Sequence, residues 1–237
     1  VFDHFCGGIN EDDCLPIIAK MYKKNVYSVL DYSVEGKEIE SQFDFALKKI
    51  LEILKYAKDN KAMPFGVFKP TGFGRLELYQ KVSEKLPLTD EEKKEWKKVE
   101  ERYEKIAKTA FDYDVPLLID AEESWMQPAV DDLLEGLMAK YNKEKVIIYS
   151  TLQLYLWDRL DYLKGLHERA RKGKFKIGMK LVRGAYMEKE RERAQQMGYP
   201  DPICKDKDAT DKNFDTVQRY MFDHIEEMAI FCCTYNE

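Results

Sequence analysis

The chain has 237 residues, of which 44% are hydrophobic and 35% are charged, and it carries a formal net charge of -5. This length allows one substantial core, in a large single domain or in two small ones. The acidic balance argues against a nucleic-acid-binding protein that neutralises phosphates, and no apolar run approaches the roughly 18 residues of a membrane-spanning helix.

The N-terminal region is expected to be a helical lead-in that covers residues 1–25. It shows neither the basic nor the apolar part of a signal peptide, so we expect an intracellular, soluble protein. Five cysteines and three histidines show no CxxC, HExxH or zinc-finger spacing, which argues against a metal site. An odd number of scattered thiols is typical of a reducing compartment.

Six segments rich in apolar and β-branched residues are predicted to be strands. Most are nearly continuous apolar runs, as expected for strands that are covered on both faces. The predicted strands lie at residues 26–34, 63–72, 115–122, 146–154, 176–186 and 228–237.

Helical patterns lie between these strands. Residues 41–58 place apolar side chains three or four positions apart, and residues 89–111 open with a capping box formed by Thr89 and Glu92. Pro128 is expected in the first turn of the next helix. Further helices are predicted at residues 155–172 and 209–227.

Two runs of charged residues, KEWKKVEERYEK at 94–105 and MEKERERAQQ at 187–196, are predicted to be solvated helix faces. Strands and helices that alternate without a hairpin signal predict a parallel sheet with helices outside it. Such a sheet is either a doubly wound open sheet or a (β/α)8 barrel. The open sheet favours a three-glycine fingerprint, and the nearest candidate, GFGRLE at 72–77, lacks the third glycine.

The barrel instead predicts functional residues where several different strands end. Polar residues recur at these ends, namely Asp31, Lys69, Asp120, Gln153 and the segment 180–186. We therefore predict an α/β fold of the (β/α)8 TIM-barrel type. A complete barrel has eight units in roughly 250 residues, whereas six strands are predicted here and the chain begins with valine. We expect residues 26–237 to be a partial barrel, with a helical insertion at about 84–111.

Several strand-end residues are candidates for chemistry. Three interpretations are open for the run Asp120-Ala121-Glu122-Glu123: general acid/base catalysis, a glycosidase carboxylate pair, and solvated acids at a helix N-terminus. Lys69 and Lys180 belong to buried strands, where a lysine needs a partner or a task, so each is a candidate anion-holding cation or Schiff-base amine. Gln153 lies in an apolar strand, and His167 is expected to be structural or exposed.

The segment KLVRGAYMEKERERA at 180–194, followed by GYPDPI at 198–203 and DATDKNFD at 208–215, resembles the signature of the proline dehydrogenase family. These are flavin-dependent enzymes that open proline catabolism. LDYSVEGKE from 30, FKPTGFGRLELYQKVS from 68, LLIDAEESWMQPAVDDL from 117 and STLQLYLWD from 150 also follow the order and spacing of that family. The resemblance spans nearly the whole chain and is closer to the monofunctional branch than to the bifunctional bacterial enzymes.

The resemblance implies a distorted (β/α)8 barrel that holds FAD across the carboxyl ends of its strands. The implied reaction oxidises L-proline, or hydroxyproline, by hydride transfer to FAD, and the product from proline is Δ1-pyrroline-5-carboxylate. Electrons then pass to a membrane quinone, with peripheral membrane contact and no nucleic-acid partner. The implied location is the cytoplasm, with or without membrane association, in a bacterium, and the mitochondrial matrix or inner membrane in a eukaryote.

The resemblance also implies roles for individual residues. Lys69 and Asp120 match residues of the catalytic and substrate-binding site, and Leu181 matches a residue beside the substrate and the flavin ring. A glycine such as Gly184 at this junction would let backbone approach a flat or phosphorylated ligand. The residues that match cofactor-binding positions are Gln153, Lys180, Val182, Gly184, Ala185, Tyr186 and Thr210.

The chain departs from the family pattern in two respects. Tyr235 stands where the family usually has a histidine against the cofactor. The paired arginines that hold the substrate carboxylate in the family are absent, and a lysine cannot replace their planar fork. We therefore expect this chain to be inactive by itself. Two alternatives stay open, namely a non-catalytic relative or fragment and a Schiff-base lyase or aldolase that uses Lys69 or Lys180.

Overall fold

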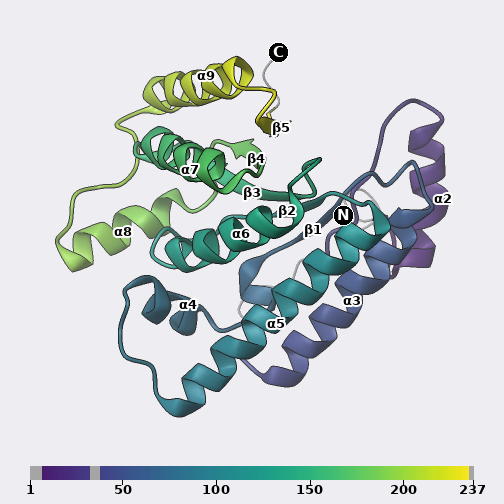
Figure 1. Cartoon of the computed structure of the whole chain (residues 1–237), viewed down its shortest axis with the longest axis horizontal. Helices are drawn as coiled ribbons and strands as arrows, with labels where there is room; N and C mark the ends of the chain where they lie inside the picture. The colour runs from purple at the N-terminus through teal and green to yellow at the C-terminus, as the bar shows by residue number, and fades with distance from the viewer. Residues whose placement is uncertain (1–6, 33–37, 235–237) are drawn as a thin grey trace.

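The computed structural model describes residues 7–32 and 38–234. These residues form a five-stranded parallel sheet with helices on its outer face (Figure 1). The strands are β1 (Gly66–Phe68), β2 (Leu117–Ile119), β3 (Ile148–Gln153), β4 (Ile177–Val182) and β5 (Met228–Cys232). The α-helices are α2 (Glu11–Tyr22), α3 (Glu40–Lys58), α4 (Leu76–Ser83), α5 (Asp90–Tyr113), α6 (Gln127–Tyr141), α7 (Arg159–Gly173), α8 (Met187–Met197) and α9 (Lys207–Asp223). None of these helices is both long and apolar enough to cross a membrane.

The strand order distinguishes the two architectures that the sequence left open. The strands lie in the order β1-β2-β3-β4-β5, and every neighbouring pair is parallel. A doubly wound sheet reverses its order part-way, whereas a barrel advances in one direction. Because every crossover here advances in the same direction, α6, α7 and α9 stack next to one another along the sheet (Figure 1). The predicted barrel-type α/β fold is confirmed, with five strands in the described residues.

The first predicted strand, at 26–34, is a correction. The described part of it, residues 26–32, is not in a strand, and residues 33–34 lie outside the described residues. Its backbone makes a contact through Ser28, whose N–H donates to the Ala62 carbonyl at 2.9 Å. Val26 and Tyr27 are 44% and 55% exposed. Apolar composition indicates a segment that can be buried, but a strand also needs a neighbouring backbone along its length, and this segment has no ladder with β1.

The helix predictions agree with the structure in type and nearly in their bounds. At the start of α5, the Glu92 N–H donates to Thr89 Oγ1 at 3.2 Å and the Thr89 N–H donates to Glu92 Oε2 at 2.9 Å, so the predicted capping box is present. Pro128 lies in the first turn of α6 as expected. The connection from β1 to β2 contains α4 and α5, and the latter packs along α3 (Figure 1).

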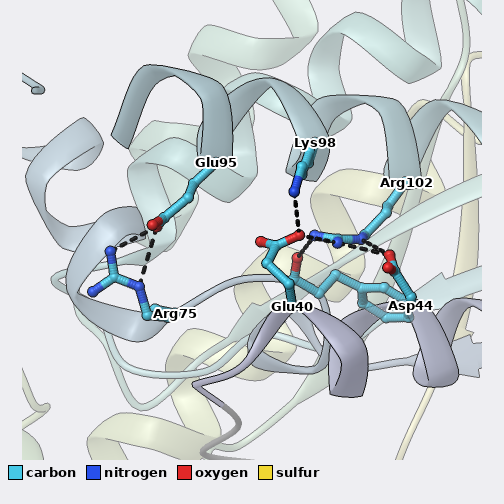
Figure 2. Close-up of polar contacts among 7 residues, drawn as sticks. Glu40, Asp44, Arg75, Glu95, Lys98 and Arg102 are labelled. Atoms are coloured by element: carbon cyan, nitrogen blue, oxygen red, sulfur yellow. Dashed lines mark hydrogen bonds and ion pairs between the residues drawn. The ribbon is translucent and has the colours of Figure 1, made fainter. Parts of the chain in front are cut away.

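The charged run of α5 was predicted to be a solvated helix face, but one of its basic residues is buried. Arg102 is only 4% exposed. Its Nη2 donates to Glu40 Oε2 at 2.7 Å and to Asp44 Oδ1 at 2.8 Å, and its Nη1 donates to the Phe73 carbonyl at 3.1 Å. Lys98 also donates to Glu40, at 2.9 Å. We name Arg102, Lys98, Glu40 and Asp44 the Arg102 cluster; Figure 2 shows both basic side chains pointing from α5 toward α3.

A second ion pair in Figure 2 ties α5 to the start of α4, where Arg75 donates to Glu95 Oε2 from Nη2 at 2.6 Å and from Nε at 3.1 Å. Together with the Arg102 bond to the Phe73 carbonyl, this pair holds the loop after β1 from two directions. The loop carries Lys69 at its start. The helical connection between β1 and β2 therefore helps to position a strand-end residue that the sequence singled out.

At the amino edge of the sheet, the side chain of Asn142 links the beginnings of β3 and β4. Asn142 is fully buried directly after α6. Its Nδ2 donates to the Ile148 carbonyl at 2.8 Å and to the Lys176 carbonyl at 3.2 Å, and its Oδ1 accepts from the N–H groups of Ile147 and Ile148, each at 2.9 Å. All of its hydrogen-bonding capacity is used within the protein, so this polar residue is structural.

Candidate active site at the carboxyl edge of the sheet

The register of the sheet brings four polar side chains into one row. Thr151 of β3 pairs with Lys180 of β4. The registers Val67 with Leu118 and Leu118 with Tyr149, continued by two residues, align Lys69 with Asp120 and Asp120 with Thr151. Since side chains alternate between the faces of a strand, all four project from the face opposite the helices.

Asp120 joins the two lysines of this row. Lys180 Nζ lies 2.6 Å from Asp120 Oδ1, and Lys69 Nζ lies 3.4 Å from Asp120 Oδ2. The three side chains are 14%, 18% and 17% exposed for Lys180, Lys69 and Asp120 respectively. We name these three residues the Lys180 cluster. One carboxylate thus orients two ammonium groups at the inner face of the sheet.

A cavity of about 370 Å³ opens above the Lys180 cluster. Its lining contains four basic side chains, Lys69, Lys180, Arg183 and Lys207, and one acidic side chain, Asp120. This balance favours an anionic group in the cavity. The predicted residues Gln153, Val182, Gly184, Ala185 and Tyr186 also line it.

A second cavity of about 850 Å³ adjoins the first. The two share the backbone segment 183–186 and Lys207 in their walls. The wall of the second cavity includes Thr210, in the first turn of α9. The structure therefore brings Lys69, Asp120, Gln153 and Thr210 to the walls of two adjacent cavities, and the segment after β4 belongs to both walls.

Gly184 is required by the protein itself. Its φ is +138°, and a Cβ atom at this position would lie 2.1 Å from the ring of Tyr155. The expectation that the glycine serves ligand approach is thus incomplete, because the buried Tyr155 ring already excludes a side chain. The neighbouring Ala185 N–H donates to Gln153 Oε1 at 3.2 Å, which fixes this loop to the end of β3.

The carboxylates after Asp120 are not solvated acids. Glu122 is 2% exposed and accepts from the N–H and the Oγ1 of Thr71, at 2.8 and 2.7 Å. Burial raises the pKa of Glu122 to about 7, although the two Thr71 hydrogen bonds act in the opposite direction. Glu123 is 5% exposed and accepts from Lys189 of α8 at 2.7 Å. Glu122 thus ties this run to the segment after β1, and Glu123 ties it to α8.

The family model of proline dehydrogenase matches residues 14–237. The chain belongs to the proline dehydrogenase family. Among curated relatives, it is 30% identical over 233 residues to the carbapenem antibiotics biosynthesis protein CarD of Pectobacterium carotovorum subsp. carotovorum. That alignment covers 98% of this chain and 61% of the relative. It is 29% identical over 279 residues to mitochondrial proline dehydrogenase 1 of Dictyostelium discoideum, in an alignment that covers 100% of this chain and 49% of the relative.

A solved structure agrees with the fold. Proline utilization A from Bdellovibrio bacteriovorus, inactivated by N-propargylglycine, superposes with a TM-score of 0.84 at 20% sequence identity. The match covers 99% of this chain and 25% of that protein. The chain therefore spans about half to three fifths of the length of the first curated relatives and a quarter of this structural neighbour.

The structure separates some family-implied residues from the Lys180 cluster. Leu181 is a correction, because its side chain is 0% exposed in the core beneath the helices, on the face of β4 opposite Lys180. A residue next to a lysine in a strand necessarily points the other way. Asp31 lines a different small cavity beside α2. Tyr235 lies outside the described residues.

Sequence reasoning missed Lys207 and gave Arg183 no role of its own within the candidate segment 180–186; both residues line both cavities of this proline dehydrogenase family member. Arg183 Nε donates to Asp211 Oδ1 at 2.6 Å, and its Nη1 donates to Thr234 Oγ1 at 3.0 Å. Lys207 pairs with the same aspartate at 2.5 Å. The position of Arg183, one residue past the end of β4, is the signal that could have marked it as a site residue in its own right.

Proposed function

We propose that the protein to which this chain belongs oxidises L-proline to Δ1-pyrroline-5-carboxylate with FAD as the hydride acceptor and a quinone as the final electron acceptor. The proposal rests on one observation above others. In a member of the proline dehydrogenase family, the Lys180 cluster lies beside a cavity whose charged lining residues are four basic side chains and one acidic side chain. This is the arrangement that an amino-acid carboxylate and an electron-accepting ring require.

The residues around the two cavities are compatible with FAD. A long cofactor needs room for both its ring system and its phosphates, and the adjacent cavities of about 370 and 850 Å³ share the wall formed by segment 183–186. We propose that Gln153, Lys180, Val182 and segment 184–186 hold the flavin ring system and that Thr210 lies near the ribose and phosphates. FAD, when bound, supplies the acceptor for the two electrons of the oxidation.

The chain's own residues would bind and orient the substrate. Lys69 offers an ammonium group to the carboxylate of proline, while Asp120 keeps that ammonium directed into the cavity. Lys180 places a second cation at the site, which stabilises negative charge that develops on a bound group. Asp120 neutralises part of this positive charge and so prevents the two ammonium groups from repelling each other at close range.

We further propose that residues 26–237 act as part of a flavin-binding barrel, with residues 1–25 as a lead-in and residues 84–111 as a helical insertion. Access to a quinone would need contact with a membrane surface. A eukaryotic source would place the protein in mitochondria, as the name of the Dictyostelium relative indicates for that protein. A bacterial source would place it in the cytoplasm, at or near the membrane.

The test is the visible absorption spectrum of the purified full-length protein before and after anaerobic addition of L-proline. We expect a flavin spectrum that bleaches with proline and recovers with a quinone analogue. D-Proline serves as the matched control and should leave the spectrum unchanged. A flavin spectrum that bleaches only with hydroxyproline would make hydroxyproline the substrate in place of proline. A colourless protein would overturn the flavoenzyme proposal.

A further inference from the structure

The edge of the sheet opposite the cavities holds a group of side chains that the proposed reaction does not use. His167 lies on α7, His224 caps the C-terminus of α9, and Glu227 directly precedes β5. One nitrogen or oxygen atom from each lies within 4.8 Å of the others. The Glu227 carbonyl accepts from the Ile177 N–H at 3.0 Å, so the group is attached to the amino ends of both β4 and β5.

His167 is arranged as a metal-binding histidine commonly is. It is 2% exposed, and its Nδ1 lies 2.7 Å from the hydroxyl of Tyr220. Its Nε2 contacts Glu227 Oε2. When Nδ1–H donates to the Tyr220 oxygen, the lone pair of Nε2 points at Glu227 and toward the centre of the group. Ligating histidines are usually held in this way, by a hydrogen bond from the second ring nitrogen.

His224 supplies the second imidazole. Its ring centroid lies 4.7 Å from that of His167 and 4.8 Å from that of Tyr220. In the part of the chain that the structure describes, no hydrogen bond to either ring nitrogen of His224 is formed. Its side chain is half-buried, so it can rotate toward His167 without disturbing the core.

We propose that His167, His224 and Glu227 bind one divalent transition-metal ion of the zinc type. Two imidazole nitrogens and one carboxylate oxygen are a ligand set that zinc accepts, with bonds of about 2.0–2.1 Å and a water at the fourth position. Ligand atoms in such a site lie roughly 3.3 Å apart. Binding would draw the His224 nitrogen inward by rotation of its side chain and would lengthen the contact between His167 Nε2 and Glu227 Oε2 to admit the ion.

The ion would have a structural role. Its ligands come from three elements that are separated along the chain, so it would cross-link α7, α9 and β5 at the amino face of the sheet, where residues of barrel proteins serve stability. Arg171 Nε donates to Glu227 Oε2 at 2.8 Å and competes for that oxygen. The Arg171 side chain is 54% exposed, so it can move to the second carboxylate oxygen when the ion binds.

The test uses chelator-treated protein, titrated with zinc chloride and followed by calorimetry, thermal unfolding and zinc-edge X-ray absorption. We expect one bound zinc with nitrogen and oxygen neighbours, and a rise in Tm of roughly 5 °C at a hundredfold excess over Kd. His224→Asn should abolish this binding. Glu227→Gln, which preserves the size of the side chain, should weaken it at least tenfold, whereas Glu226→Gln at the adjacent exposed position should leave it unchanged.

The alternative is a metal-free hydrogen-bonded histidine, in which Nε2–H of His167 donates to Glu227. Failure of the wild-type protein to bind zinc at micromolar concentration would establish that alternative and overturn the proposal. Zinc affinities of His224→Asn and Glu227→Gln that both equal the wild-type affinity would also overturn it. Binding that is lost only when the exposed Cys232 and Cys233 are replaced by serine would assign the ion to those thiols instead. None of these measurements depends on flavin or on proline.

Discussion

The Arg102 cluster and the Lys180 cluster both consist of basic and acidic side chains, but they differ in charge balance and surroundings. In the Arg102 cluster, two cations meet two carboxylates between α3 and α5 (Figure 2). The guanidinium donors of Arg102 are engaged by two side chains and one carbonyl. Such a balanced cluster serves to hold helices together.

In the Lys180 cluster, two ammonium groups share the carboxylate of Asp120 beside a cavity. Further basic side chains line the same cavity, so positive charge is in excess where a ligand can enter. The difference shows that an ion pair in a buried position is not by itself a sign of function. Charge that is directed into a hollow and only partly balanced is a better indicator.

The largest effect expected from this comparison is on stability. Arg102→Met should lower the free energy of unfolding by about 3 kcal/mol, because it leaves the Phe73 carbonyl and Asp44 without their donor and removes one of the two donors to Glu40. Urea unfolding measures this value. Flavin content of the folded fraction should not change, and a stability loss below 1 kcal/mol, within the range of a surface pair, would contradict a structural role.

The next effect is on function and depends on the proposed reaction. Lys180→Met should slow anaerobic flavin reduction by proline about 100-fold, equivalent to about 2.7 kcal/mol of transition-state stabilisation. The Tm should change little, because the partly exposed Asp120 is then solvated. Lys176→Met, just before the opposite end of the same strand, is the control. Equal reduction rates in both variants would remove Lys180 from the active site.

A smaller effect concerns the buried carboxyl that adjoins the Lys180 cluster. The pKa of Glu122 is raised from 4.5 to about 7 in the folded protein, so the folded state holds this proton more tightly than the unfolded state. The stabilisation from this group is present below about pH 4.5 and is lost as the pH rises through about 7.

Between pH 5 and 8, the stability of the wild-type protein relative to Glu122→Gln should therefore fall by roughly 2 kcal/mol. Denaturant unfolding of both proteins at several pH values measures this difference. Glu100→Gln, on an exposed position of α5, should show no such pH dependence. A stability difference between wild type and Glu122→Gln that is constant with pH would show that Glu122 does not titrate in this range.

The smallest effect distinguishes two members of the Arg102 cluster. Lys98 is 52% exposed and pairs with Glu40 at 2.9 Å, whereas the Arg102 side chain is 5% exposed. Lys98→Met should change the free energy of unfolding by about 0.5 kcal/mol or less, as exposed pairs do. High salt should remove the effect of Lys98→Met but not that of Arg102→Met. A cost for Lys98→Met close to that for Arg102→Met would mean that burial does not determine the contribution.

Much of the fold could be predicted because its signals are local. Five of the six predicted strands each contain one observed strand, although the predicted bounds are too wide, and the capping box of Thr89 and Glu92 marks the start of α5. The strand-end argument alone selected Lys69, Asp120 and Gln153, all of which line the first cavity. Their roles toward FAD and proline, which came from the family resemblance, stay predictions.

Other features could not be predicted, because they depend on which segments meet. Glu190 belongs to a run that was expected to be solvated, yet it is 0% exposed and accepts from the N–H and Oγ of Ser124, each at 2.6 Å. The sequence did not distinguish Glu122, which is 2% exposed, from the acidic residues next to it. Charge in the sequence indicates the cost of burial, but it does not show whether a distant segment supplies the compensating donors.

The sequence by itself determined the alternation of strands and helices, the barrel-type fold and the family, since periodicity, capping and family motifs are properties of contiguous residues. The tertiary structure alone decided that residues 26–32 form no strand, that Leu181 faces the core and that Arg102 is buried. It also brought together His167, His224 and Glu227, whose spacing matches no metal motif. These outcomes depend on pairing and packing between elements that are far apart in the chain, which no local pattern encodes.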